Sequence, residues 1–194
     1  MIPDPRIPDS SASKAEWRSW AKWTRPQLPD VSEDVCLHLR RFLLDIPGRM
    51  TVLAYRALPG EIRLETLVTN LPAITWLTSR VQGSSLSLHD YALASVTNRL
   101  GILEPTADAP RVAFANVDVV LTPGLVFDAR GSRLGFGRGY YDRLFTQLRP
   151  DVLRIGVTCE ALLVDRLPND PWDAPMTHLS TERGVKKILL DSAP

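Results

Sequence analysis

The stretch VDVVLTPGLVFDARGSRLGFGRGYYDRLFTQL, residues 117–148, contains the patterns on which the predicted fold is built. It opens with an apolar run at residues 117–121, which Pro123 ends shortly afterwards. A short apolar run of this kind is typical of a strand buried on both faces. Residues 140–148 then carry apolar side chains at helical spacing. The stretch therefore predicts a buried strand and a helix, joined by a long loop with a polar turn at Asp128.

A glycine-rich loop precedes this helix, with glycines alternating at Gly135, Gly137 and Gly139. Because glycine adopts positive φ readily, such a loop can turn successive N–H groups toward an anion. The helix that follows offers free N–H groups and the positive end of its dipole. Arg133 and Arg138 add positive charge. The pattern predicts a phosphate site, although the same glycines would also suit a plain tight turn.

Two common nucleotide motifs do not fit this loop. The dinucleotide fingerprint places G-x-G-x-x-G directly after a strand, and a Walker A loop requires Gly-Lys-Ser/Thr. Asp142 lies one turn beyond the glycines. A carboxylate beside bound phosphates is typical of a magnesium site, so Asp142 is a candidate metal ligand.

The segment PGLVFDARGSRLGFGRGYYDR, residues 123–143, resembles the signature of the 5-formyltetrahydrofolate cyclo-ligase family, also called methenyltetrahydrofolate synthetases. That signature reads roughly Pro-Gly-x-x-Phe-Asp-x-x-Gly-x-Arg-Leu-Gly-x-Gly-x-Gly-Tyr-Tyr-Asp-Arg, and every fixed position is present. Its length makes it far more specific than the glycines alone. The resemblance implies one domain over residues 1–194 that folds as a three-layer α/β/α sandwich. Residues 1–10 are polar and contain three prolines, so we expect them to be loosely held.

Composition limits the class of protein. Hydrophobic residues make up 44% of the chain and charged residues 23%, as in ordinary globular proteins, and the formal net charge is +1. This charge implies no bulk attraction to nucleic acid or to a membrane surface. Cys36 and Cys159 have neither metal-site spacing nor a disulfide pattern, so we expect a reducing cytoplasm. We see no signal peptide and no apolar span, and we expect a monomer or a weak homo-oligomer.

The first predicted helix runs from a capping box at residues 13–16 to about Thr24. Lys14, Arg18 and Lys22 share one face of it, and three tryptophans share another. Taken alone, this pattern favours a solvated basic face beside a packed aromatic face. The family resemblance instead implies that Lys14 and Arg18 reach the phosphates of ATP.

The remaining elements alternate along the chain. Ser32 is expected to cap a second helix, and a third is expected to run from Glu61 to about Leu71. Strands are expected near residues 50, 73, 117 and 152. This alternation predicts an α/β fold whose largely parallel sheet is covered on both faces. Ligands of such sheets bind beyond the carboxyl ends of the strands.

The resemblance also implies roles for particular residues. Glu61, Arg56 and Tyr140 would hold a reduced folate, Asp142 and Asp173 would hold Mg²⁺, and Lys14 and Arg138 would act in catalysis. The residues expected at ATP are Lys14, Arg18, Arg133, Gly135, Phe136, Gly137, Arg138, Gly139, Tyr140 and Tyr141. Residues 78–98 match the family pattern poorly and leave recognition of the pterin ring open.

The implied activity is the cyclisation of 5-formyltetrahydrofolate to 5,10-methenyltetrahydrofolate, driven by ATP with magnesium through phosphorylation of the formyl oxygen. Two alternatives stay open: an ATP-binding relative acting on another metabolite, and a folate-binding regulator without this activity. A nucleic-acid module is disfavoured by the near-neutral charge.

Overall fold

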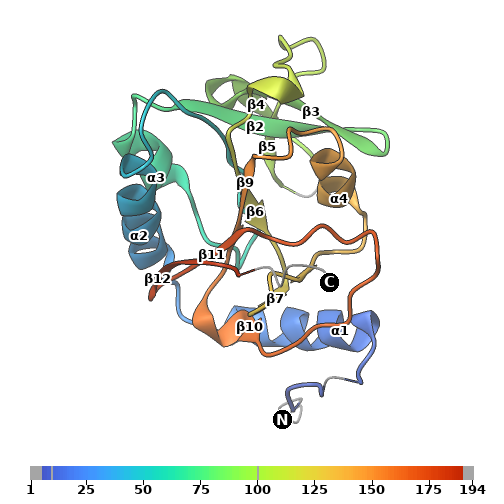
Figure 1. Ribbon diagram of the computed structural model, residues 1–194. Coiled ribbons are helices and arrows are strands. Elements are labelled where there is room, and N and C mark those ends of the chain that lie inside the picture. The colour runs from blue at the N-terminus through green and yellow to red at the C-terminus, as the bar shows by residue number, and fades with distance from the viewer. Residues whose placement is uncertain (1–5, 10, 100, 190–194) are drawn as a thin grey trace.

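The structure, a computed structural model, describes residues 6–9, 11–99 and 101–189, so residues 1–5 and 10 of the expected loose start lie outside the described residues. A seven-stranded sheet in the order β12-β11-β9-β6-β1-β2-β3 forms its centre (Figure 1). The bounds of these strands are β1 Thr51–Leu53, β2 Thr75–Gln82, β3 Ser85–Asp90, β6 Val119–Pro123, β9 Leu153–Val157, β11 His178–Thr181 and β12 Gly184–Lys187.

The sheet is largely parallel, as the sequence predicted. β1 pairs in parallel with β2 and β6, β6 with β9, and β9 with β11. Only the edge strands β3 and β12 are antiparallel to their neighbours. Both edges are hairpin partners that the sequence patterns did not predict. The four expected strands, near residues 50, 73, 117 and 152, are adjacent in the centre of the sheet.

Helices cover both faces of the sheet. α2 (Ser32–Leu44) and α3 (Glu65–Asn70) lie on one side, and α4 (Tyr140–Phe145) lies on the other (Figure 1). Strand side chains alternate between the two: Val119 and Leu121 pack in the α2–α3 core, whereas Val120 packs with Leu144 and Phe145 of α4. The apolar run at 117–121 is therefore buried on both faces because each face has a helical layer.

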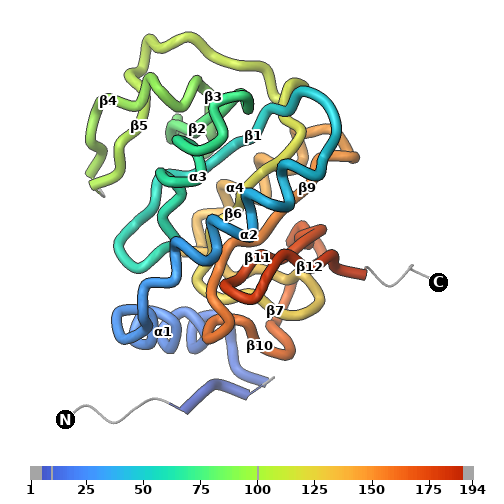
Figure 2. Tube along the Cα trace, turned by 90° about the vertical axis from the view of Figure 1, so that its left-hand side faces the viewer, coloured from blue at the N-terminus to red at the C-terminus, as the bar shows by residue number. Residues whose placement is uncertain are grey.

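A smaller unit sits at one end of this sandwich. α1 (Lys14–Thr24), followed by the 3-10 turn η1 (Arg25–Gln27), packs against a three-stranded sheet. The strands of that sheet are β7 (Val126–Asp128), β8 (Arg133–Leu134) and β10 (Leu163–Val164). Trp17 and Trp20 are buried there, and the predicted capping box between Ser13 and Glu16 is present. At the other end, the hairpin of β4 (Ala94–Thr97) and β5 (Leu103–Pro105) lies beside β2 and β3 (Figure 2).

Three expected helix boundaries are wrong. Glu61 begins no helix, because α3 starts at Glu65. Ser32 is the first residue of α2 rather than its cap: its hydroxyl accepts the N–H of Arg63, while Asp30 accepts the N–H of Ser32. α4 ends at Phe145, not at residue 148. Within the described residues, no helix is long and apolar enough to cross a membrane.

Candidate active site

A cavity of about 540 Å³ lies at the carboxyl ends of β1 and β6. Its lining brings together every residue expected to bind a ligand or to act in catalysis: Lys14, Arg18, Arg56, Glu61, Arg133, Gly135, Phe136, Gly137, Arg138, Gly139, Tyr140, Tyr141, Asp142 and Asp173. These residues come from α1, from the loop after β1, from the glycine loop with α4, and from the segment before β11. A single cavity therefore collects predicted residues that are up to 159 positions apart in the chain.

The glycine loop leaves β8 and turns directly into α4. Gly137 and Gly139 have φ values of +91° and +65°, a conformation that favours glycine. Arg18 crosses from α1 to the loop, where its Nε donates to the carbonyl of Gly135 at 3.0 Å. A Cβ atom added at Gly137 would lie 3.5 Å from the guanidinium carbon of Arg18. The basic face of α1 and the glycine loop thus form one continuous part of the cavity lining.

Lys14 does not face solvent freely. Its Nζ lies 2.5 Å from Asp173 Oδ2 and 2.7 Å from Asp170 Oδ2. Burial lowers the pKa of Lys14, but the two carboxylates outweigh that effect, so the pKa lies above its ordinary value. Lys22, on the same face of α1, is exposed. The solvated-face interpretation therefore holds for Lys22 but not for Lys14.

Arg133 and Asp142 form a second ion pair in the lining. Arg133 Nη2 lies 3.0 Å from Asp142 Oδ1, and the Arg133 side chain is only 7% exposed. The guanidinium also lies 5.4 Å from the ring centroid of Tyr141. Arg133 therefore orients Asp142 and Tyr141 from beneath the loop, whereas Arg138 is exposed on the loop itself.

Glu61 is buried beside the end of β1, with 8% of its surface exposed. Its Oε2 accepts the N–H of Leu58 at 2.9 Å, and its own N–H donates to the Leu58 carbonyl, which closes a turn through Gly60. Burial raises the pKa of Glu61, while the Leu58 N–H and the charge of Arg25 oppose the rise. Glu61 lies in this turn, not in the helix expected from its position before an apolar run.

Arg56 lines the same side of the cavity. Its guanidinium carbon lies 3.4 Å from the ring centroid of Tyr91, and its Nη2 donates to the Tyr91 carbonyl at 2.8 Å. Stacking and hydrogen bonding together fix the direction of this long side chain. A fixed cation here is suited to a carboxylate or to the polar edge of a ring.

The poorly matched stretch 78–98 contributes directly to the cavity. It forms most of the β2–β3 hairpin, from which Ser79, Val81 and Leu86 line the cavity. Arg80, between Ser79 and Val81, points elsewhere: its Nη1 donates to the Pro105 carbonyl at 2.6 Å and lies 3.7 Å from Glu104. Sequence reasoning missed Ser79, Val81 and Leu86 as cavity residues. Alternation of polar and apolar residues can indicate a half-buried strand, but it does not indicate that one face of the strand contacts a ligand.

α4 is tied to the tip of this hairpin. Arg143 Nε donates to the Ser84 carbonyl at 2.7 Å, and the Tyr140 hydroxyl donates to the Gly83 carbonyl at 3.5 Å. The glycine loop and the hairpin are thus held together at the rim of the cavity.

Asp142 and Asp173 come from separate segments and line one cavity. Two carboxylates are a donor set that Mg²⁺ takes, since it keeps its other positions for phosphate and water. Among the described residues there is no group of three or more His, Cys, Asp and Glu side chains that could hold a metal by themselves. The donor set therefore fits an ion that shares its coordination with a bound phosphate.

Known proteins resemble this chain over nearly its whole length. The 5-formyltetrahydrofolate cyclo-ligase family matches residues 46–182. The 5-formyltetrahydrofolate cyclo-ligase of Mycolicibacterium smegmatis is 33% identical over 190 residues, covering 91% of this chain and 97% of that protein. The solution structure of Aquifex aeolicus 5,10-methenyltetrahydrofolate synthetase is 31% identical, with a TM-score of 0.75, over 93% of this chain and 94% of that one.

A 5,10-methenyltetrahydrofolate synthetase from Mycoplasma pneumoniae has the same fold, with a TM-score of 0.71 at 22% identity, over 87% of this chain and 97% of that one. The family match covers more than half of the chain, and the M. smegmatis relative is covered almost completely. The chain therefore belongs to the 5-formyltetrahydrofolate cyclo-ligase family, a family of ligases.

Proposed function

We propose that this chain converts 5-formyltetrahydrofolate to 5,10-methenyltetrahydrofolate, with ATP cleaved to ADP and phosphate. The observation that carries the proposal is the first cavity, which gathers all the residues that the family resemblance assigns to ligand binding and catalysis. Its volume of about 540 Å³ is typical of small-molecule sites. The names of two relatives support this proposal, because one names 5-formyltetrahydrofolate and the other names 5,10-methenyltetrahydrofolate.

The phosphate end of the cavity would be the glycine loop with α1. Gly135, Gly137 and Gly139 carry no side chains at alternate positions of the loop, so that backbone N–H groups can approach an anion closely there. Lys14 and Arg18 reach the same place from the helix, and Arg138 adds an exposed guanidinium. Such an arrangement supplies positioning and positive charge, which are the main requirements of phosphoryl transfer.

The chemistry requires activation of a poor leaving group. The formyl oxygen attacks the γ-phosphorus of ATP, the bond from that phosphorus to the bridging oxygen breaks, and ADP leaves. N10 of the folate then attacks the formyl carbon, loses its proton, and the C–O bond breaks to release phosphate. The protein needs no covalent nucleophile, only groups that orient the reactants and stabilise negative charge.

Asp142 and Asp173 would hold a magnesium ion at the phosphate end of the cavity. When bound, this ion supplies positive charge to phosphate oxygens. Lys14 and Arg133, which pair with these two carboxylates in the free chain, keep them oriented toward the cavity.

The folate end would be formed by Glu61, Arg56 and the β2–β3 hairpin. A buried carboxylate accepts hydrogen bonds from the N–H groups of a pterin ring, and the apolar side chains of Val81 and Leu86 offer a surface for a flat ring. This end depends on residues that match the family pattern poorly, so specificity for the folate is the part of the proposal most open to test.

A spectroscopic assay tests the proposal directly. The purified chain should form methenyltetrahydrofolate from 5-formyltetrahydrofolate only when ATP and magnesium are both present. ATP binding without product absorbance at any folate concentration would contradict the proposal and favour a relative that acts on another metabolite.

A further inference from the structure

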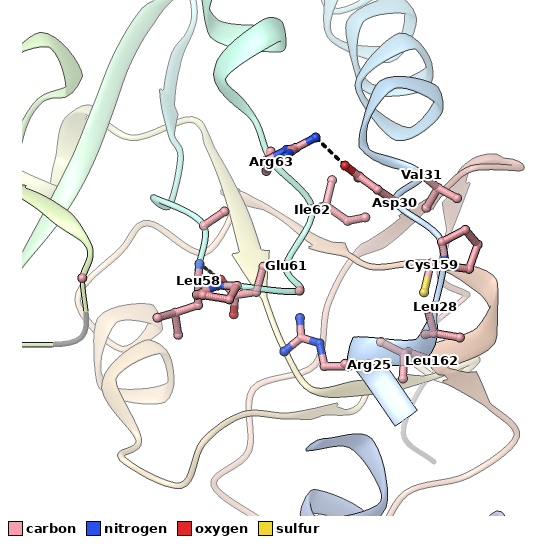
Figure 3. Close-up of a pocket in the computed structure, with 15 residues that line it drawn as sticks. Arg25, Leu28, Asp30, Val31, Leu58, Glu61, Ile62, Arg63, Cys159 and Leu162 are labelled. Atoms are coloured by element: carbon pink, nitrogen blue, oxygen red, sulfur yellow. Dashed lines mark hydrogen bonds and ion pairs between the residues drawn. The ribbon is translucent and has the colours of Figure 1, made fainter. Parts of the chain in front are cut away.

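A second cavity, of about 430 Å³, shares Leu58 and Glu61 with the first. The connection between α1 and α2 lines it together with the loop of residues 57–63 (Figure 3). Cys159 and Leu162 also line it, beside Leu28 and Val31 (Figure 3). The turn that carries Glu61 therefore separates two cavities, and the buried carboxylate can be influenced from both.

Two arginines line the second cavity, and their surroundings differ. Arg63 is 67% exposed and is paired with Asp30. Arg25 instead points toward Glu61, and its Nε is buried without a hydrogen-bond partner among the described residues (Figure 3). The Cβ of Arg25 lies beside the Glu61 turn, at 3.8 Å from where a Cβ atom built on Gly60 would be.

We propose that Arg25 is a positioning residue for folate binding, whose guanidinium acts from the second cavity to keep the Glu61 carboxylate charged and able to accept hydrogen bonds in the first. The inference rests on the function proposed above. It assigns Arg25 no contact with substrate, since Arg25 lines only the second cavity.

The charges around Glu61 support this role. Burial raises the pKa of Glu61, whereas the Leu58 N–H and the Arg25 charge lower it. The phenols of Tyr55 and Tyr141 also face Glu61, and burial together with the Glu61 charge raises the pKa of each. Both phenols therefore stay neutral, and Arg25 provides the positive charge that opposes the cost of burying the carboxylate.

The protonation state of Glu61 matters for the ligand proposed here. An ionised carboxylate only accepts hydrogen bonds, whereas a protonated one also donates. The edge of a pterin ring presents neighbouring N–H donors, so a protonated Glu61 would place one donor against another. Loss of the Arg25 charge should therefore weaken folate binding most at acidic pH, where Glu61 protonates first.

Calorimetric titration of 5-formyltetrahydrofolate without ATP tests this pH dependence. Arg25→Gln should bind folate more weakly than the unaltered chain, about tenfold at the acidic end of the pH range in which the chain stays folded and within about twofold at the alkaline end. Arg25→Lys should restore most of the affinity. Arg63→Gln, in the same cavity, should change neither value, and ATP affinity should be equal in all variants. A loss that is the same at every pH, or an equal loss in Arg63→Gln, would overturn the inference in favour of a purely structural role.

A second measurement does not depend on activity or on folate. The carboxyl ¹³C shift of Glu61, assigned with Glu61→Gln, reports its titration in the ligand-free chain. The midpoint should move to higher pH in Arg25→Gln and return in Arg25→Lys. An unchanged midpoint overturns the inference even if the enzyme is active. A shifted midpoint in a chain that makes no methenyltetrahydrofolate would contradict the proposed function instead.

Discussion

The ammonium of Lys14 lies 2.5 Å from the carboxylate of Asp173, so the proposed phosphate ligand and the proposed metal ligand are paired with each other in the free chain. Asp170 takes a second position on the same ammonium at 2.7 Å, and its N–H donates to Asp173. The segment before β11 is thus held against α1 through one lysine. If a phosphate and a metal ion bind here as proposed, Lys14 would pair with the phosphate and Asp173 with the metal ion, in place of their pair with each other.

The first prediction concerns Lys14 and Arg138, the two proposed catalytic residues. Lys14→Ala and Arg138→Ala should each weaken ATP binding, because each removes a charge-assisted contact worth roughly 1.5–3 kcal/mol. Folate affinity measured without ATP should change little. Lys22→Ala is the control, since Lys22 lies on the same helix face but is exposed. Calorimetry that finds unchanged ATP affinity in both variants would exclude Lys14 and Arg138 from the phosphate site.

The metal prediction concerns Asp142 and Asp173. Asp142→Asn and Asp173→Asn should raise the magnesium concentration needed for turnover and lower turnover sharply, and the double variant should be little worse than either single one. Asp170→Asn is a matched control, because Asp170 also pairs with Lys14 but does not line the cavity.

A magnesium titration of these four variants separates the possible causes. An equal response of Asp170→Asn and Asp173→Asn would assign the effect to Lys14 rather than to a metal ion. Near-normal turnover of Asp142→Asn at low magnesium would remove Asp142 from the site. Thermal melting should accompany the titration, since Asp142→Asn also leaves the nearly buried Arg133 guanidinium without its charged partner.

Glu61→Gln should stabilise the fold while it removes folate binding. Burial raises the pKa of Glu61 above its ordinary value of 4.5, so the ionised form costs free energy in the folded chain. Glu61 contributes its full stability below pH 4.5 and loses it as the pH rises through the raised pKa. The melting temperatures of the two chains should therefore agree in acid and separate toward neutral pH, with glutamine the more stable. A difference in melting temperature that grows as the pH falls would contradict a raised pKa of Glu61.

Asp128 is expected to support the fold rather than the chemistry. Its side chain is completely buried, and its oxygens accept the N–H groups of Arg130, Ser132 and Leu167 at 3.0, 2.8 and 2.9 Å. Asp128→Asn replaces one accepting oxygen by an NH₂ group, which cannot accept from these backbone N–H groups. The substitution should lower the free energy of unfolding by about 3 kcal/mol. Urea unfolding measures the change, and the exposed Asp108→Asn serves as the control. A loss of less than about 0.5 kcal/mol would show that the site adapts.

Gly137→Ala tests the glycine loop against a matched glycine elsewhere. Gly137 and Gly48 have nearly equal φ values of +91° and +94°, but only an added Cβ at Gly137 would meet another residue, Arg18. Both alanine variants should lose about 1–2 kcal/mol of stability from backbone strain. Only Gly137→Ala should also weaken ATP binding. Equal ATP affinities would assign Gly137 to the turn alone.

Several elements could be predicted because short stretches of sequence encode them. The capping box at Ser13 set the start of α1, and the apolar run at 117–121 placed a strand that is buried on both faces. The signature at 123–143 identified the family, because its fixed residues lie close together in the chain. Such signals survive without knowledge of long-range contacts, since helix caps, strand periodicity and turn glycines act over a few residues.

The contacts between distant segments could not be predicted in this way, because they form when the core packs. Glu61 precedes an apolar run and suits a helix start. In the structure, Ile62 and Leu64 are buried in the core, and the Glu61 carboxylate instead accepts the N–H of Leu58 in a turn. The stretch 78–98 carries no recognisable motif, yet pairing in the sheet places its side chains in the cavity. The contacts of Lys14 with Asp170 and Asp173 span more than 150 residues. The energy of such ion pairs depends on burial and distance, and neither is set until the core has packed.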